Sequence, residues 1–149
     1  MPDWNIIGIH HTAINATDFD RSLAFYRDTL GFTVLRQREI SGERLASLTN
    51  LPEPRARTAM LAAGNNLIEL FEYLAPPPRN MVARPCDVGI THVALLVSDI
   101  QAAYEGLSAK GVEFNCAPGF VPEGPMKGWT ITYFRDPDGI SLELMQPPA

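Results

Sequence analysis

The chain has 149 residues, of which 46% are hydrophobic and 19% are charged, and its formal net charge is −5 at pH 7. These values are ordinary for a globular protein, and the length fits one domain or two small modules that share a core. An acidic chain without a basic stripe argues against nucleic-acid binding, and no apolar run approaches the ~20 residues of a membrane span. The start of the chain has no signal-peptide pattern. We therefore expect a cytoplasmic protein that binds neither nucleic acid nor membrane.

The first half of the chain predicts one strand, one helix and three further strands. A strand is expected over 6–16, where His10 would point away from His11 and be structural. A helix then follows Asp18, a typical N-cap residue. One apolar face runs along this helix, formed by Phe19, Leu23, Tyr26 and Leu30. The remaining strands are expected over 32–40, 56–63 and 66–73, with an insertion at 41–55.

The second half predicts the same order of elements after a proline-rich connector. A strand over 89–98 precedes Asp99, which would cap a second helix with Ile100, Ala103, Tyr104 and Leu107 on its apolar face. Further strands are expected over 112–116, 129–135 and 140–146, with an insertion at 117–128. The turn DPDG would join the last two strands as a hairpin.

These parallels make the chain an internal duplication. The phrase HTAINATDF begins at His11 and the similar phrase HVALLVSDI begins at His92. The landmarks follow in one order in each half, as His11, Asp18, Gly31 and Glu69, then as His92, Asp99, Gly111 and Glu143. We expect an α+β fold of paired βαβββ modules, over 1–74 and 89–149, joined by the connector 75–88 into one structural domain.

The repeated histidines and glutamates predict a metal site. Side chains alternate between the two faces of a strand, and Glu69 and Glu143 each lie between apolar residues that share the other face. An unpaired buried carboxylate is costly, so a glutamate and a histidine that recur in register favour a ligand role. Two imidazoles and two carboxylates suit Zn, Ni, Co, Mn or Fe(II) better than Ca or Mg.

The segments HTAINATDFDRSLAFYRDTLGF, HVALLVSDI and FRDPDGISLEL resemble the vicinal oxygen chelate superfamily, which includes glyoxalases, bleomycin-resistance proteins and extradiol dioxygenases. The resemblance implies a cup-shaped mixed sheet over a divalent metal, a small-molecule substrate and a homodimer. By position, the implied metal ligands are His11, Glu69, His92 and Glu143. Because some members exchange modules, the four ligands need not come from one chain.

A set of two histidines and two glutamates resembles that of glyoxalase I, and the resemblance implies an isomerase, epimerase or lyase that moves a proton through a metal-stabilised enediolate. The base would be Glu143, with Glu69 as the other candidate. An extradiol ring-cleaving dioxygenase is the first alternative, although Glu69 would fill one of its open metal positions. A non-catalytic, antibiotic-binding resistance protein is the second alternative, and its relatives generally lack the full ligand set.

Several other residues are candidates for substrate contact. Tyr73 lies four positions after Glu69 and would share its strand face. The glycine- and proline-rich loop 119–129 would cover the cup, and Arg57 would pair with a substrate carboxylate or phosphate. Either face of the strand 129–135 would line the cup. The candidates are Tyr73, Met126, Lys127, Trp129, Tyr133 and Arg57.

Overall fold

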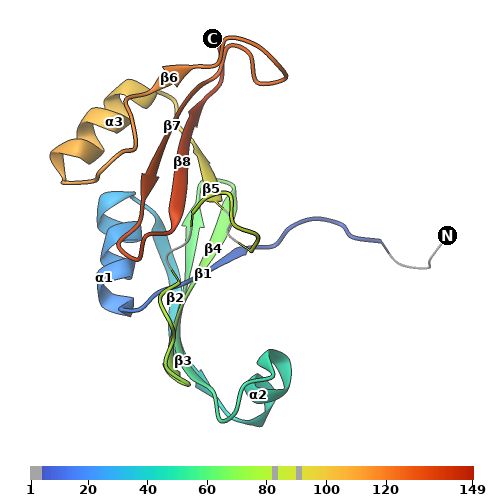
Figure 1. Ribbon diagram of the computed structural model, residues 1–149. Helices are drawn as coiled ribbons and strands as arrows, with labels where there is room; N and C mark the ends of the chain where they lie inside the picture. The colour runs from blue at the N-terminus through green and yellow to red at the C-terminus, as the bar shows by residue number, and fades with distance from the viewer. Residues whose placement is uncertain (1–4, 82–83, 90–91) are drawn as a thin grey trace. The chain divides into compact units, whose positions relative to one another are not determined.

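The computed structural model describes residues 5–81, 84–89 and 92–149. The chain forms two compact units, Met1–Arg79 and Asn80–Ala149. The first unit contains β1 (Thr12–Asn15), α1 (Phe19–Ala24), a π-helical turn η1 (Phe25–Thr29), β2 (Thr33–Ser41), α2 (Glu43–Thr49), β3 (Arg55–Ala63) and β4 (Asn66–Ala75). The second contains β5 (His92–Leu96), α3 (Ile100–Ala109), β6 (Gly119–Phe120), β7 (Thr130–Arg135) and β8 (Ser141–Gln146) (Figure 1).

Both units have the same sheet topology. The strand order is β1-β4-β3-β2 in the first unit and β5-β8-β7-β6 in the second. In each unit the first and last strands pair in parallel, and the other pairs are antiparallel. The expected α+β fold of two βαβββ modules is therefore confirmed.

The helix that follows the first strand begins after an aspartate N-cap and is followed by a glycine in both units. The Asp18 carboxylate accepts a hydrogen bond of 3.0 Å from the backbone N–H of Arg21, and Asp99 accepts one of 2.9 Å from Ala102. These bonds satisfy N–H groups that a helix start leaves without partners. Gly31 and Gly111 follow the helices with φ of 77° and 85°, a left-handed conformation that favours glycine.

The hydrophobic core of each unit lies between its helix and one face of its sheet. In the first unit α1 packs on β3 and β4 (Figure 1), and Phe19, Leu23 and Tyr26 are buried. In the second unit α3 packs on β8, and Leu142 and Leu144 are buried. The opposite face of each sheet is thereby left for the histidines and glutamates of the repeat. Among the described residues, no helix is long and apolar enough to span a membrane.

Three expected elements differ from the structure. The strand expected from residue 6 begins only at Thr12, which pairs with Ile68, although β4 itself begins at Asn66. The segment 112–116 forms no regular strand. It pairs with β7 through the isolated bridge between Phe114 and Phe134, and the Thr132 hydroxyl donates a hydrogen bond to the Cys116 carbonyl. The insertion 41–55 contains the short helix α2.

Candidate metal centre

The first histidine–glutamate pair lies where β1 meets β4. Ala13 is the parallel partner of Glu69, and His11 stands two residues before Ala13. The Nε2 atom of His11 lies 3.1 Å from an Oε atom of Glu69. Ile68 and Leu70 are buried in the core on either side of Glu69, so its side chain points to the opposite face of β4.

The second pair repeats this arrangement where β5 meets β8. Ala94 is the parallel partner of Glu143, and His92 stands two residues before Ala94. The distance from Nε2 of His92 to an Oε atom of Glu143 is again 3.1 Å. Since the register and the distance agree, the repeat in the sequence is a repeat in three dimensions.

Each pair combines a buried carboxylate with a partly open imidazole. The side chains of Glu69 and Glu143 are 12% and 6% exposed, whereas those of His11 and His92 are 35% and 48% exposed. A carboxylate buried this far needs a cation or hydrogen-bond donors beside it. Because the histidine side is open, an ion or a substrate oxygen can reach the pair from solvent.

The geometry of each pair fits two neighbouring ligands of one transition-metal ion. Two ligand atoms about 2.1 Å from an ion and at a right angle around it are about 3.0 Å apart, close to the 3.1 Å found twice. The same separation suits a hydrogen bond when Nε2 carries a proton, so each pair stays together with or without an ion. Within the described ranges, no three His, Cys, Asp or Glu side chains gather in one group; the four predicted ligands are found as two pairs.

His10 has a role that sequence reasoning missed. Its Nδ1 atom lies 2.8 Å from Nδ1 of His11, and the two rings meet edge to face at 5.1 Å. The expectation that His10 points away from His11 assumed a strand, but both residues precede β1 and their rings are in contact. A hydrogen bond at Nδ1 fixes the ring and leaves Nε2 facing Glu69.

Tyr133 supports the second pair. It is the antiparallel partner of Glu143, which places both side chains on one face of the sheet. The Tyr133 hydroxyl donates a hydrogen bond to Glu143, and burial, followed by this interaction, raises the pKa of Tyr133 above its ordinary value of 10.0. The face of β7 that carries Tyr133, rather than the face of Thr132 and Phe134, therefore lies beside Glu143.

Tyr73 lies on the expected face of β4. It stacks on Phe71, with ring centroids 5.8 Å apart and planes 13° from parallel. Glu69, Phe71 and Tyr73 occupy every second position of the strand and therefore share one face. An aromatic wall thus continues the strand face from the first carboxylate.

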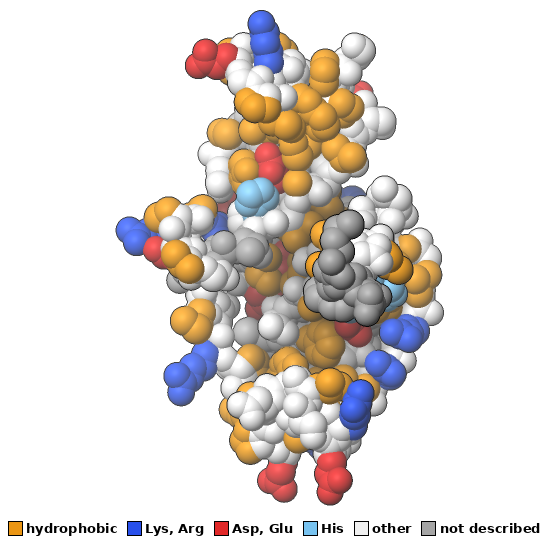
Figure 2. All heavy atoms as spheres, turned by 90° about the vertical axis from the view of Figure 1, so that its right-hand side faces the viewer, with side chains coloured by type: hydrophobic (Ala, Val, Ile, Leu, Met, Phe, Trp, Pro, Cys, Tyr) orange, Lys and Arg blue, Asp and Glu red, His pale blue; other side chains and the backbone are white. Residues whose placement is uncertain are grey.

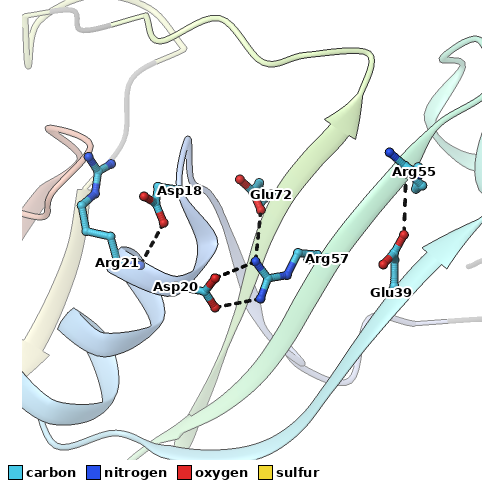
Figure 3. Close-up of polar contacts among 7 residues, drawn as sticks. All are labelled: Asp18, Asp20, Arg21, Glu39, Arg55, Arg57 and Glu72. Carbon is cyan, nitrogen blue, oxygen red and sulfur yellow. Dashed lines mark hydrogen bonds and ion pairs between the residues drawn. The ribbon is translucent and has the colours of Figure 1, made fainter.

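The structure does not bring Arg57 to this face, which corrects that candidate. Arg57 is the partner of Glu72 on the helix-packed side of the sheet. Its guanidinium makes two hydrogen bonds to Asp20, of 2.9 and 2.7 Å (Figure 3). It also lies 4.3 Å from the Phe19 ring centre. The guanidinium therefore joins α1 to the sheet, and its hydrogen-bond donors are directed to Asp20.

The loop candidates Met126, Lys127 and Trp129 lie in a closed hairpin between β6 and β7. The N–H of Val121 donates to the Trp129 carbonyl at 2.8 Å, and Lys127 N–H donates to Gly124 at 3.1 Å. Trp129 is four residues from Tyr133, or about 13 Å along the strand. Within the second unit, these three side chains are not brought beside Glu143.

Apolar side chains are also exposed on the surface. Figure 2 shows them gathered in the upper part of the view. In the second unit, Leu96 and Phe120 are exposed. In the first unit, Ile6, Ile7 and Ile9 are between 83% and 95% exposed, on a segment that leads away from β1 (Figure 1). Apolar surface of this extent is typical of a binding or association site.

Comparison with known proteins identifies the family. The family model described as the Glyoxalase/Bleomycin resistance protein/Dioxygenase superfamily matches residues 8–144. The chain is 34% identical to a 2-epi-5-epi-valiolone epimerase from Actinomyces sp., over 96% of the chain and 81% of that relative. It is 33% identical to a probable lactoylglutathione lyase from Synechocystis, over 91% of the chain and 92% of the relative.

A solved structure agrees with this assignment at the level of the fold. The chain matches the crystal structure of a glyoxalase family protein from Bacillus cereus with a TM-score of 0.84 at 22% identity, over 100% of this chain and 99% of the other. The named activities among the relatives, an epimerase and a lyase, support an enzyme. The chain belongs to the Glyoxalase/Bleomycin resistance protein/Dioxygenase superfamily.

Proposed function

We propose that the protein is a divalent-metal-dependent isomerase, epimerase or lyase that moves a proton on a small oxygenated metabolite. The observation that carries this proposal is the pair of histidine–glutamate contacts, which have the same register and the same 3.1 Å separation. The names of the curated relatives, an epimerase and a lyase, support the same class of reaction.

The proposed metal ligands are His11, Glu69, His92 and Glu143. Two imidazole nitrogens and two carboxylate oxygens form a set that Zn, Ni, Co, Mn or Fe(II) accepts. When bound, such a cation makes a C–H group next to a carbonyl more acidic, because it stabilises negative charge on the oxygen. We propose that one ion is shared by both pairs, with the pairs supplied by one chain or by two.

The proton would be carried by a glutamate of this set. A carboxylate accepts a proton at one Oε atom while its other oxygen stays bound to its neighbours. Both Glu69 and Glu143 are buried on the face away from the core, and each lies 3.1 Å from the Nε2 atom of its histidine. The open side of His11 and His92 would admit the substrate, and Phe71 and Tyr73 would form one wall.

We further propose a homodimer. Ile6, Ile7 and Ile9 form an apolar segment of the first unit that the rest of the chain leaves in solvent. Burying an isoleucine side chain contributes about 1.5 to 3 kcal/mol, so a second copy that covers these three residues would gain substantial free energy.

The test is proton exchange in D₂O with two substrates taken from the relatives' names, 2-epi-5-epi-valiolone and lactoylglutathione. NMR would follow deuterium incorporation at the carbon next to the carbonyl, with metal-loaded protein and with protein stripped by chelator. Exchange that requires metal and is lost in the Glu69→Gln, Glu143→Gln double variant is the expected result. Exchange at equal rates in stripped and loaded protein would contradict the proposal.

A further inference from the structure

The two histidine–glutamate pairs differ in the residue that stands opposite the glutamate on the neighbouring strand. Tyr133 stands opposite Glu143, and Met60 stands opposite Glu69. Directly opposite residues in an antiparallel pair have their Cβ atoms about 5 Å apart on one face. A hydroxyl donor is therefore placed against one carboxylate of the repeat and a thioether against the other.

Tyr133 contacts both members of the second pair. Its hydroxyl donates a hydrogen bond to Glu143. Its ring also meets the His92 ring edge to face, with centroids 5.3 Å apart and planes at 76°. One side chain on a strand thus restricts the carboxylate and the imidazole together, and Tyr133 is itself half-buried.

The first pair has a different support. Met60 is buried and has no strong hydrogen-bond donor to offer Glu69. The restriction there acts on the imidazole instead, through the hydrogen bond of His10 to His11. Glu69 is thus held by its backbone and its histidine, whereas Glu143 has an additional side-chain anchor.

We propose that Tyr133 is a positioning residue that fixes Glu143, so that the two carboxylates of the repeat are not equivalent. Glu143 is the stationary ligand, and Glu69 is the carboxylate with freedom to turn. The consequence for catalysis rests on the proposed function, since it concerns ligands of the proposed ion. The positioning itself is a property of the second unit alone.

The variant Tyr133→Phe tests the hydroxyl, because it removes the donor and keeps the ring beside His92. Side chains that hydrogen-bond metal ligands typically contribute a factor of about 10 to 100 in metal affinity. We expect a Zn²⁺ affinity lower by that factor, measured in competition with a chromophoric chelator. The matched control is Met60→Leu at the equivalent strand position, which conserves volume and should leave the affinity nearly unchanged.

Double variants show which glutamate Tyr133 acts through. In a Glu143→Gln background, Tyr133→Phe should lower Zn²⁺ affinity little further, because the hydrogen bond between Tyr133 and residue 143 is already impaired. In a Glu69→Gln background, Tyr133→Phe should lower Zn²⁺ affinity by the same factor as in wild type. Equal losses in the two backgrounds would overturn the assignment to Glu143.

A second readout needs no metal. In metal-free protein, Tyr133→Phe should shift the imidazole ¹⁵N and ¹H signals of His92 and leave those of His11 in place. If wild-type protein binds no metal, the proposed function fails, and this spectrum still decides the positioning role. Unchanged His92 signals would overturn the inference.

Discussion

The Nδ1 atoms of His10 and His11 lie 2.8 Å apart, so one imidazole donates to the other and the ring of His11 is held with Nε2 toward Glu69. Histidine ligands of metals usually have such a partner on their second nitrogen, and losing it weakens binding by about 10- to 100-fold.

We therefore predict that His10→Phe lowers Zn²⁺ affinity by about this factor. Because His10 is exposed, the melting temperature of the metal-free protein should stay the same, which separates a local effect from unfolding. Chelator competition measures the affinity, and an unchanged value would show that His10 does not orient His11.

A glutamate substitution should affect catalysis only when the residue lies on the face of β4 or β8 that carries Glu69 or Glu143. Glu143→Gln and Glu69→Gln keep the shape of the side chain and remove its charge and basicity. Each should reduce deuterium exchange by a factor of at least about 100, the lower range for general acid–base catalysis.

The matched control for these substitutions is Glu72→Gln. Glu72 lies on β4 but on the helix-packed face beside Arg57, so its variant should keep the exchange rate. A comparable loss in Glu72→Gln would mean that the rate reports folding of the unit and not chemistry at the pair.

The ion pair between Arg57 and Asp20 should make stability depend on pH. The hydrogen bond from Arg57 lowers the pKa of Asp20 below its ordinary value of 3.8. A lowered carboxyl pKa gives stability that is present above pH 3.8 and is lost as the pH falls through the folded-state pKa. Asp20→Asn should therefore have a lower melting temperature than wild type at neutral pH. The difference between the two melting temperatures should become smaller at acid pH.

The exposed pair of Arg55 and Glu39, at 3.8 Å, provides the control for Asp20 (Figure 3). This single long contact lacks the two hydrogen bonds that Arg57 donates to Asp20, and such pairs contribute little, so Glu39→Gln should have a melting temperature close to that of wild type at both pH values. Thermal melting curves of the three proteins decide the question. A difference for Asp20→Asn that stays constant down to acid pH would contradict the assignment.

The proposed dimer depends on the apolar segment before β1. Replacing Ile6, Ile7 and Ile9 by serine should shift the protein toward monomer in sedimentation velocity at micromolar concentration. The single variant Leu48→Ser removes a residue that is also exposed, at 67%, and should leave the association unchanged. A triple variant that sediments as wild type would exclude this segment from the interface.

The sequence predicted the repeated side chains because they alternate with core residues. Leu142 and Leu144 are buried around Glu143, as Ile68 and Leu70 are around Glu69, so strand periodicity alone gives the direction of each carboxylate. The N-caps Asp18 and Asp99 were equally local signals and were confirmed.

The residues that sequence reasoning misplaced depend on pairing between strands. Arg57 was named as a partner for a substrate carboxylate or phosphate from its residue type, and only the register with Glu72 shows its side of the sheet. The orientation of Tyr133 was left open for the same reason. His10 was misjudged because the strand was expected to include it, whereas β1 begins only at Thr12.

The proposed metal site can be tested directly by measuring how much metal the protein binds. Protein purified without chelator and reloaded with Zn²⁺ would be analysed by elemental mass spectrometry, beside the single variants His11→Ala and His92→Ala. We expect one ion per chain in wild type and almost none in either variant, because the proposed ion is held by both pairs. Two ions per chain, loss in only one variant, or no bound metal after reloading would contradict it.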